Sequence, residues 1–141
     1  MDFHRRSFRP LTRTATGDYY EGQWSDLTNK RDGFGYCISL DSGYLYEGYW
    51  SEGNQHGDGR LMLANGYYEG QFNMNQRHGQ GKYVWNSGDH YTGEWVSSMK
   101  SGFGRLFAIA ENQIYEGHFK NNKKHGDGKI IDAAGIVISR G

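Results

Sequence analysis

Five copies of a short glycine-containing repeat constrain what this chain can fold into more than any other feature. Each copy has a Tyr and, four residues later, a Trp or Phe, with a Gly midway, and the tyrosines stand at positions 20, 46, 68, 91 and 115. A Gly-x-Gly element follows the second aromatic residue, after six residues in the last four copies and after eight in the first. A repeat of 22 to 26 residues indicates one supersecondary unit that recurs along the chain.

The glycines favour strands over helices. A Tyr and a Trp four residues apart could share one helix face, but each copy carries three glycines in or just after this pair, and Gly destabilises a helix interior. In a strand, successive side chains point to opposite faces, so Tyr46, Gly48 and Trp50 share one face and Glu47 lies on the other. The pattern therefore predicts one β-hairpin per copy.

A single hairpin register suits the whole repeat. If Trp50 lies opposite Gly57, then Glu47 lies opposite Arg60, and on the other face a large ring covers a row of glycines. The equivalent register predicts these further pairs: Tyr46 with Leu61, Gly48 with Gly59, Glu21 with Tyr36, Glu69 with Lys82, Thr92 with Arg105, and Glu116 with Lys129.

The two ends of the chain resemble partial repeats. Residues 136–139 are expected to form a closing strand, and residues 11–15 an opening strand at the end of a basic and aromatic N-terminal tail, residues 1–16. Residues 17–141 are expected to form one repeat domain. The predicted fold class is all-β, an elongated, twisted antiparallel meander of about twelve strands built of tandem hairpins.

The repeat resembles the MORN repeat, whose pattern is Tyr-x-Gly-x-Trp/Phe, six residues, then Gly-x-Gly. The resemblance covers residues 20 to 135; the first copy departs through its two-residue insertion, and the fourth has Thr92 and Ser101 where other copies have Glu and His. It implies a twisted β-sheet of the kind found in scaffolding and tethering proteins of the cytoskeleton, of cilia and flagella, and of membrane contacts. Such repeats also accompany kinase or methyltransferase domains, and at 141 residues this chain is expected to be a repeat-only member.

The aromatic row is the main candidate for a binding surface. No helical segment is expected to cover a single sheet, so part of the row should stay exposed as a groove for an amphipathic helix or an extended segment of a partner protein. The row consists of Tyr20, Trp24, Tyr46, Trp50, Tyr68, Phe72, Tyr91, Trp95, Tyr115 and Phe119.

The N-terminal tail is a second candidate. Its residues leave three alternatives open, namely docking on a partner, disorder, and contact with anionic lipid. The residues considered for docking are Arg5, Arg6, Phe8, Arg9 and Arg13.

The composition disfavours several classes of function. Sixteen basic and sixteen acidic residues give a net charge of zero, which does not indicate a nucleic-acid-binding protein. Cys37 is the only cysteine, so no internal disulfide is expected, and no apolar run reaches the length of a membrane span. His56, His78 and His125 recur two strands apart, too far to share a zinc ion. No catalytic motif is present, and no enzyme activity, metal or cofactor is expected.

These features predict a non-enzymatic scaffold or adaptor that binds a protein partner through the aromatic groove. The alternatives are a peripheral membrane adaptor that binds anionic lipids, and an accessory subunit of an enzyme complex. Self-association through the edge strand near residues 136–138 is a further expectation. Cytoplasmic, cytoskeleton-associated localisation, with a cilium or flagellum and its axoneme foremost, rests on the resemblance alone.

Overall fold

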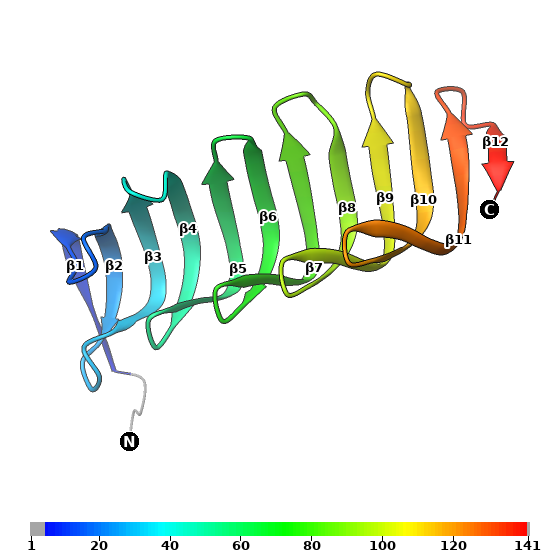
Figure 1. The fold of residues 1–141 in the computed structure, drawn as a ribbon. Coiled ribbons are helices and arrows are strands. Elements are labelled where there is room, and N and C mark those ends of the chain that lie inside the picture. Colours follow the sequence, from blue (N-terminus) through cyan, green and yellow to red (C-terminus); the bar gives the residue numbers. More distant parts are fainter. Residues whose placement is uncertain (1–4, 141) are drawn as a thin grey trace. The chain divides into compact units, whose positions relative to one another are not determined.

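The structure, a computed structural model, describes residues 5–140 and contains twelve strands and no helix in that range. The strands follow one another in sequence order, and neighbouring strands are antiparallel (Figure 1). The predicted all-β meander of successive hairpins is therefore confirmed. The strands are β1 (Arg6–Arg13), β2 (Tyr19–Ser25), β3 (Arg31–Ser39), β4 (Tyr44–Ser51), β5 (Asn54–Leu63), β6 (Gly66–Asn73), β7 (Gln76–Trp85), β8 (His90–Val96), β9 (Met99–Ala108), β10 (Gln113–Lys120), β11 (Lys123–Asp132) and β12 (Val137–Arg140).

The chain packs as two compact units. Of the described residues, the first unit comprises residues 5–64 with 71–75, and the second comprises residues 65–70 with 76–140. The first unit thus holds β1 to β5 and the end of β6, whereas the second holds the start of β6 and β7 to β12. Each unit is described below by itself.

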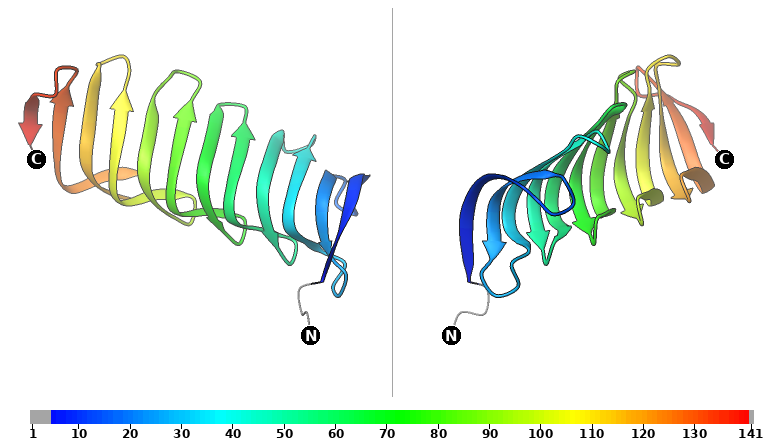
Figure 2. Two further views of the ribbon diagram at one scale, coloured as in Figure 1. Left: turned by 180° about the vertical axis from the view of Figure 1, so that it is seen from behind. Right: turned by 60° about the vertical axis from the view of Figure 1, so that its left-hand side comes forward.

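Tight turns close the hairpins of the last four copies. Each turn has two central residues with positive φ, which is the geometry of the type I′ turn and matches the right-handed twist of the flanking strands. Seen from two further sides, the strands of these hairpins are bent along their length (Figure 2). The turn residues are Glu52 and Gly53, Met74 and Asn75, Ser97 and Ser98, and Asn121 and Asn122.

Each of these turns is hydrogen-bonded to the repeat before it. In the second unit, Asn122 N donates to Lys100 O at 3.0 Å, and Asn122 Oδ1 accepts from Lys100 N at 2.8 Å. Ser98 makes the same two contacts with Arg77. In the first unit, Asn75 makes them with Gln55. In these three turns, the second turn residue therefore hydrogen-bonds both the backbone N–H and the backbone C=O of one residue in the preceding copy.

The predicted register is correct for the central pairs and wrong for the second aromatic residue. Trp50 lies opposite Gln55 and not opposite Gly57, because the β4–β5 ladder shifts by two residues after Gly48. Gly57 has a φ of +92°, a left-handed conformation that lets β5 bulge at this point. The pairs confirmed are Tyr46–Leu61, Glu47–Arg60, Gly48–Gly59, Glu21–Tyr36, Thr92–Arg105 and Glu116–Lys129, whereas Glu69–Lys82 stays a prediction.

The second glycine of each Gly-x-Gly element has a different role from the first. A Cβ on Gly59 would lie 2.4 Å from the hydroxyl oxygen of Tyr46, and a Cβ on Gly104 would lie 2.3 Å from that of Tyr91. No side chain fits there, so the tyrosine ring lies directly on the glycine backbone. The predicted row of rings over glycines is confirmed.

The opening strand begins earlier than predicted. It spans Arg6–Arg13, not residues 11–15, so half of the predicted tail, residues 1–16, forms β1, and residues 1–4 of that tail lie outside the described residues. The strand ends at a turn in which Thr14 N donates to Asp18 O at 2.7 Å. The ladder with β2 is interrupted between Arg9 and Thr12, where Pro10 has no N–H to donate. The closing strand, Val137–Arg140, lies one residue from its predicted place.

The buried tyrosines predict a loss of stability at high pH. Tyr20, Tyr46 and Tyr91 are fully buried; burial raises the pKa of the first two well above their usual range and that of Tyr91 to about 12. In the unfolded chain a tyrosine ionises near pH 10, so above that value the unfolded state holds fewer protons and gains free energy relative to the fold.

We therefore expect the free energy of unfolding to fall as the pH rises from about 10 to 12, by about 1.4 kcal/mol per pH unit for each buried tyrosine. Burial also raises the pKa of Tyr44 and Tyr83, which act in the same direction, whereas Lys100 and Arg77, whose pKa values are lowered, act in the opposite direction. Urea titrations across this range measure the effect, and the Tyr91→Phe variant should show a smaller pH dependence. A free energy of unfolding independent of pH up to about 12 would contradict the prediction.

Candidate partner-binding face

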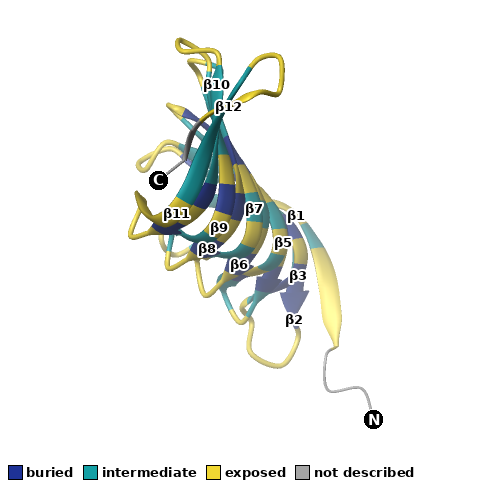
Figure 3. Cartoon of the chain, turned by 90° about the vertical axis from the view of Figure 1, so that its right-hand side faces the viewer, coloured by how far each residue is buried: buried dark blue, intermediate teal, exposed yellow. Residues whose placement is uncertain are grey.

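The aromatic row is buried, which corrects the expectation that part of it stays open as a groove. Figure 3 shows buried and exposed residues alternating along the strands. Tyr115 is half-buried, and the other nine rings of the row are buried, with Trp24 the most exposed at 9%. The rings predicted to contact a partner thus form the core of this fold.

The rings cover one another edge to face, which is why a single sheet can bury them. In the first unit the Tyr46 ring lies 5.0 Å from Trp50 and 5.1 Å from Phe72, with the rings nearly perpendicular. In the second unit Tyr91 makes the same contacts with Trp95 at 5.2 Å and Phe119 at 5.1 Å. Tyr46 and Tyr91 therefore each join the aromatic residue of their own copy to that of the next copy.

Cationic side chains also cover the rings of the aromatic row. The register shift places one residue of each copy opposite the second aromatic residue, as in the pairs Trp24–Arg31 and Trp95–Lys100. Four of these five residues are basic, and we refer to them as the cation row; the second copy has Gln55 instead. The cation row consists of Arg31 in the first unit and Arg77, Lys100 and Lys124 in the second.

The cations lie over the rings. Arg31 Cζ is 4.3 Å from the centre of the Trp50 ring. In the second unit Arg77 Cζ is 4.9 Å from Trp95, and Lys124 Nζ is 4.8 Å from Tyr115. Such cation–π contacts hold the charged groups in place on the outer side of the aromatic row.

The cation row lacks acidic partners among residues 5–140. No ion pair joins its members to a described carboxylate, and the Arg31 guanidinium donates to neutral atoms, Gly53 O at 3.2 Å and Cys37 Sγ at 3.6 Å. Burial lowers the pKa of Arg77, and burial followed by the charge of Arg77 lowers that of Lys100. The two positive charges therefore repel each other in a partly dehydrated setting.

Sequence reasoning missed the cation row. Its position is visible as the residue two places before each Gly-x-Gly element. The predicted register, however, put the first glycine of that element opposite the ring. Only the left-handed bulge at that glycine brings the basic side chain over the aromatic residue.

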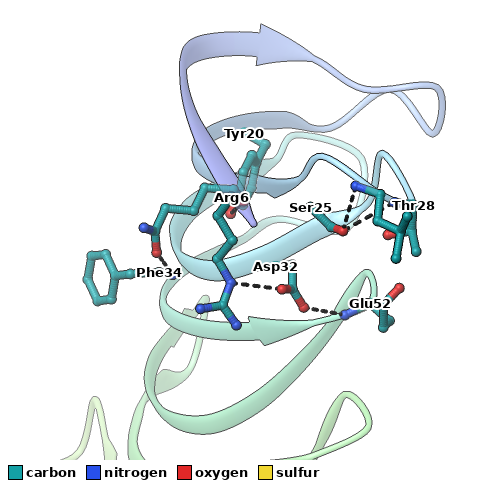
Figure 4. Close-up of polar contacts among 9 residues, drawn as sticks. Arg6, Tyr20, Ser25, Thr28, Asp32, Phe34 and Glu52 are labelled. Carbon is teal, nitrogen blue, oxygen red and sulfur yellow. Dashed lines mark hydrogen bonds and ion pairs between the residues drawn. The ribbon is translucent and has the colours of Figure 1, made fainter. Parts of the chain in front are cut away.

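Most of the predicted tail residues contact the first unit itself. Arg6 Nε donates to Asp32 Oδ2 at 2.8 Å, and Asp32 Oδ1 accepts from Glu52 N at 3.0 Å (Figure 4). Arg5 forms a longer ion pair with Asp26. Among the other predicted residues, Phe8 is 65% exposed, Arg9 lies over the Trp24 ring, and Arg13 lines a pocket.

The opposite face of the sheet carries the predicted charge pairs. In the second unit the Glu116 carboxylate lies 3.1 Å from Arg105 Nε and 3.8 Å from Lys129 Nζ. Arg105 and Lys129 on this face thus share an acidic partner, unlike the members of the cation row.

Cys37, the only cysteine of the sequence, is buried in the first unit. Burial raises the pKa of the Cys37 thiol, which disfavours the reactive thiolate. Residues 5–140 contain no cluster of three or more His, Cys, Asp or Glu residues able to hold a metal ion. The same part of the chain contains no helix able to span a membrane.

The chain is similar to a solved structure and to a family of known proteins. A crystal structure of a catalytically inactive virginiamycin B lyase from Staphylococcus aureus, with quinupristin, matches 96% of this chain at 10% identity and a TM-score of 0.24; this chain covers 60% of that protein. A likeness that weak carries no argument. The family model described as MORN repeat matches residues 20–43, 46–66, 68–90, 91–108 and 115–136, one copy in each segment. Since these segments make up well over half of the sequence, the chain belongs to the MORN-repeat family.

Proposed function

We propose that this protein is a non-enzymatic scaffold or adaptor that binds an acidic helical or extended segment of a partner protein along the second-unit members of the cation row, Arg77, Lys100 and Lys124. MORN repeats are commonly scaffold modules that bind proteins or lipids, and the family is not typically enzymatic. The observation that carries the proposal is a row of basic side chains held on buried rings without acidic partners among the described residues.

The geometry favours such a partner for two reasons. Arg77 and Lys100 are half-buried, and their mutual repulsion is relieved when a carboxylate lies between them. The rings and the bulged backbone also hold the stems of these side chains, so little conformational entropy is lost on binding. Charge-assisted hydrogen bonds that such groups donate to a carboxylate are among the strongest that a surface offers.

Peptide selection tests the proposal. A random peptide library displayed on phage is selected on the full chain, and the affinity of an enriched peptide is measured by fluorescence anisotropy. We expect the enriched peptides to be rich in Asp and Glu. Replacing both central cations, Arg77→Gln with Lys100→Gln, should weaken binding by at least about tenfold, because each lost charge-assisted bond is worth about 1.5–3 kcal/mol. Gln55 already occupies the equivalent position in the second copy, so the chain tolerates this side chain.

A charge-matched variant on the opposite face serves as the control. Lys82→Gln with Lys129→Gln removes the same charge from the face that carries Glu116, and it should change the affinity by less than about twofold. Equal affinities of the cation-row variant and the unmodified chain would refute the proposal. Flotation of the same variants with vesicles of anionic lipid separates the alternative, a peripheral membrane adaptor.

The cellular setting belongs to the same proposal. Its support is the occurrence of MORN repeats in scaffolds, and the setting proposed is a cytoskeletal or ciliary assembly in the cytoplasm. Fluorescence microscopy of the tagged full chain in its native cells, with an axonemal marker, tests this part separately.

A further inference from the structure

A basic pocket lies at the start of the first unit, apart from the second-unit cations Arg77 and Lys100. It has a volume of about 360 Å³, which is within the range of small-molecule sites. Its walls come from β1, from the turn between β1 and β2, and from the loop between β2 and β3. The loop between β2 and β3, which contains the two-residue insertion of the first copy, supplies Asn29 and Lys30 to the pocket.

Four cations line this pocket, and none of them forms an ion pair with a described residue. Arg9 donates to the neutral Asn29 Oδ1 at 2.8 Å, and Arg31 donates to a carbonyl and a thiol. Arg13 and Lys30 are exposed, and no carboxylate is among the described residues that line the pocket.

Three acidic residues in or next to the segments that form the pocket have other partners. Asp26, in the loop between β2 and β3, pairs with Arg5. Asp18, in the turn after β1, accepts from the Thr16 hydroxyl at 3.3 Å. Asp32 is held by Arg6. The charges of the pocket therefore stay largely uncompensated.

Trp24, which lines the same pocket, has an unsatisfied donor. In two other copies the indole nitrogen donates to a glycine carbonyl of the preceding strand, Trp50 to Gly35 at 3.2 Å and Trp95 to Gly81 at 3.0 Å. Trp24 Nε1 is buried and finds no acceptor in residues 5–140. The strand that precedes Trp24 is the interrupted β1, so this copy lacks an acceptor that other copies have.

We propose that this pocket binds a phosphomonoester group. A phosphomonoester carries close to two negative charges at neutral pH and three acceptor oxygens. Arg9, Arg13 and Arg31 offer guanidinium groups, which suit phosphate oxygens, and Lys30 adds a point charge. The ligand differs from that of the proposed partner-binding function, and Arg31 is the one residue common to the pocket and the cation row. The variants that test the two proposals share no residue, so each proposal can fail without the other.

Titration with inorganic phosphate tests this site. The full chain is labelled with ¹⁵N, phosphate replaces chloride at constant ionic strength, and the indole N–H signal of Trp24 is followed, assigned with Trp24→Phe. We expect a saturable shift. The variant Arg13→Gln with Lys30→Gln should weaken the binding of phosphate by at least about tenfold, whereas Arg77→Gln with Lys100→Gln should leave it unchanged.

A variant with the same loss of charge elsewhere is the control. Lys120→Gln with Lys123→Gln alters two exposed lysines of the second unit and should bind phosphate like the unmodified chain. A shift that does not saturate, or one that the pocket variant retains in full, overturns the proposal. So does equal weakening by the pocket variant and the control, which would indicate nonspecific attraction.

A vesicle flotation experiment identifies whether the phosphate group belongs to a lipid or to a soluble ligand. The chain is mixed with phosphatidylcholine vesicles that carry, or lack, phosphatidylinositol 4-phosphate. Flotation only with the phosphorylated lipid, reversed by free inositol 1,4-bisphosphate and lost in Arg13→Gln with Lys30→Gln, assigns the site to a lipid headgroup. Saturable binding of inorganic phosphate without flotation assigns it to a soluble ligand.

Discussion

Replacing Tyr46 by Ala is expected to lower the free energy of unfolding by about 4 kcal/mol, the size seen when a buried aromatic residue is truncated. Tyr46 is fully buried, and its hydroxyl donates to Tyr49 O at 2.8 Å. Its ring joins Trp50 to Phe72, so the substitution opens a cavity between two copies and removes two ring contacts at once. No second layer of structure in the first unit can collapse onto that cavity.

Urea or thermal denaturation followed by near-ultraviolet circular dichroism measures this effect. The matched control is Tyr49→Ala, which removes a tyrosine of the same strand from the opposite face, where it is 51% exposed. That change should cost about 1 kcal/mol or less, since little buried area is lost. If both variants were equally stable, the aromatic row would not be the core of the fold.

Replacing Gly104 by Ala is expected to cost about 3 kcal/mol, a large effect for the addition of one methyl group. The new Cβ would lie 2.3 Å from the Tyr91 hydroxyl oxygen and 2.4 Å from the nearest ring carbon. The ring cannot move aside, because its hydroxyl donates to Glu94 O at 2.9 Å and its edges contact Trp95 and Phe119.

A double-mutant cycle isolates the cause. In a Tyr91→Leu background the obstructing ring is absent, so Gly104→Ala should then cost less than about 1 kcal/mol. Gly53→Asn is a second control, because Gly53 is in a left-handed turn position that Asn75 and Asn122 occupy in other copies. That variant should be nearly as stable as the unmodified chain. Equal costs of Gly104→Ala in both backgrounds would exclude the ring as the cause.

The central ladder was predictable because two constraints reinforce each other. The period of two places Glu47 and Glu116 on one face, and the opposite charges of Arg60 and Lys129 then select a register. The burial of the rings was not predictable by the same reasoning. It depends on the bulge at the first glycine of Gly-x-Gly, which shifts the second aromatic residue by two positions and brings a cation over it. Strict alternation of side chains between the two faces predicts a constant register and therefore does not predict this shift.

The basic pocket was beyond sequence reasoning for a related reason. The insertion in the first copy was visible as a departure from the pattern, but its consequence depends on where the loop lies in space. Residues 25–30 turn back on themselves through Ser25, whose hydroxyl oxygen accepts from Leu27 N at 3.2 Å and Thr28 N at 3.1 Å. This loop places Lys30 beside Arg9 and Arg13 of a strand that was predicted to start later.

The hydrogen bonds between turns and earlier copies give each unit a direction. Asn122 hydrogen-bonds the backbone N–H and C=O of Lys100, and Ser98 hydrogen-bonds those of Arg77. The backbone of a copy is therefore satisfied by the turn of the copy that follows it. Repeats of this kind are not equivalent under deletion. Removing the last copy takes an acceptor and a donor from the backbone of the copy before it, whereas removing the first copy takes from the Gly53 N–H its acceptor, Arg31 O, in the turn of the copy after it. A shortened or lengthened array of this repeat therefore needs a different cap at each end: a turn that satisfies backbone groups at the carboxyl end, and backbone groups that receive a turn at the amino end.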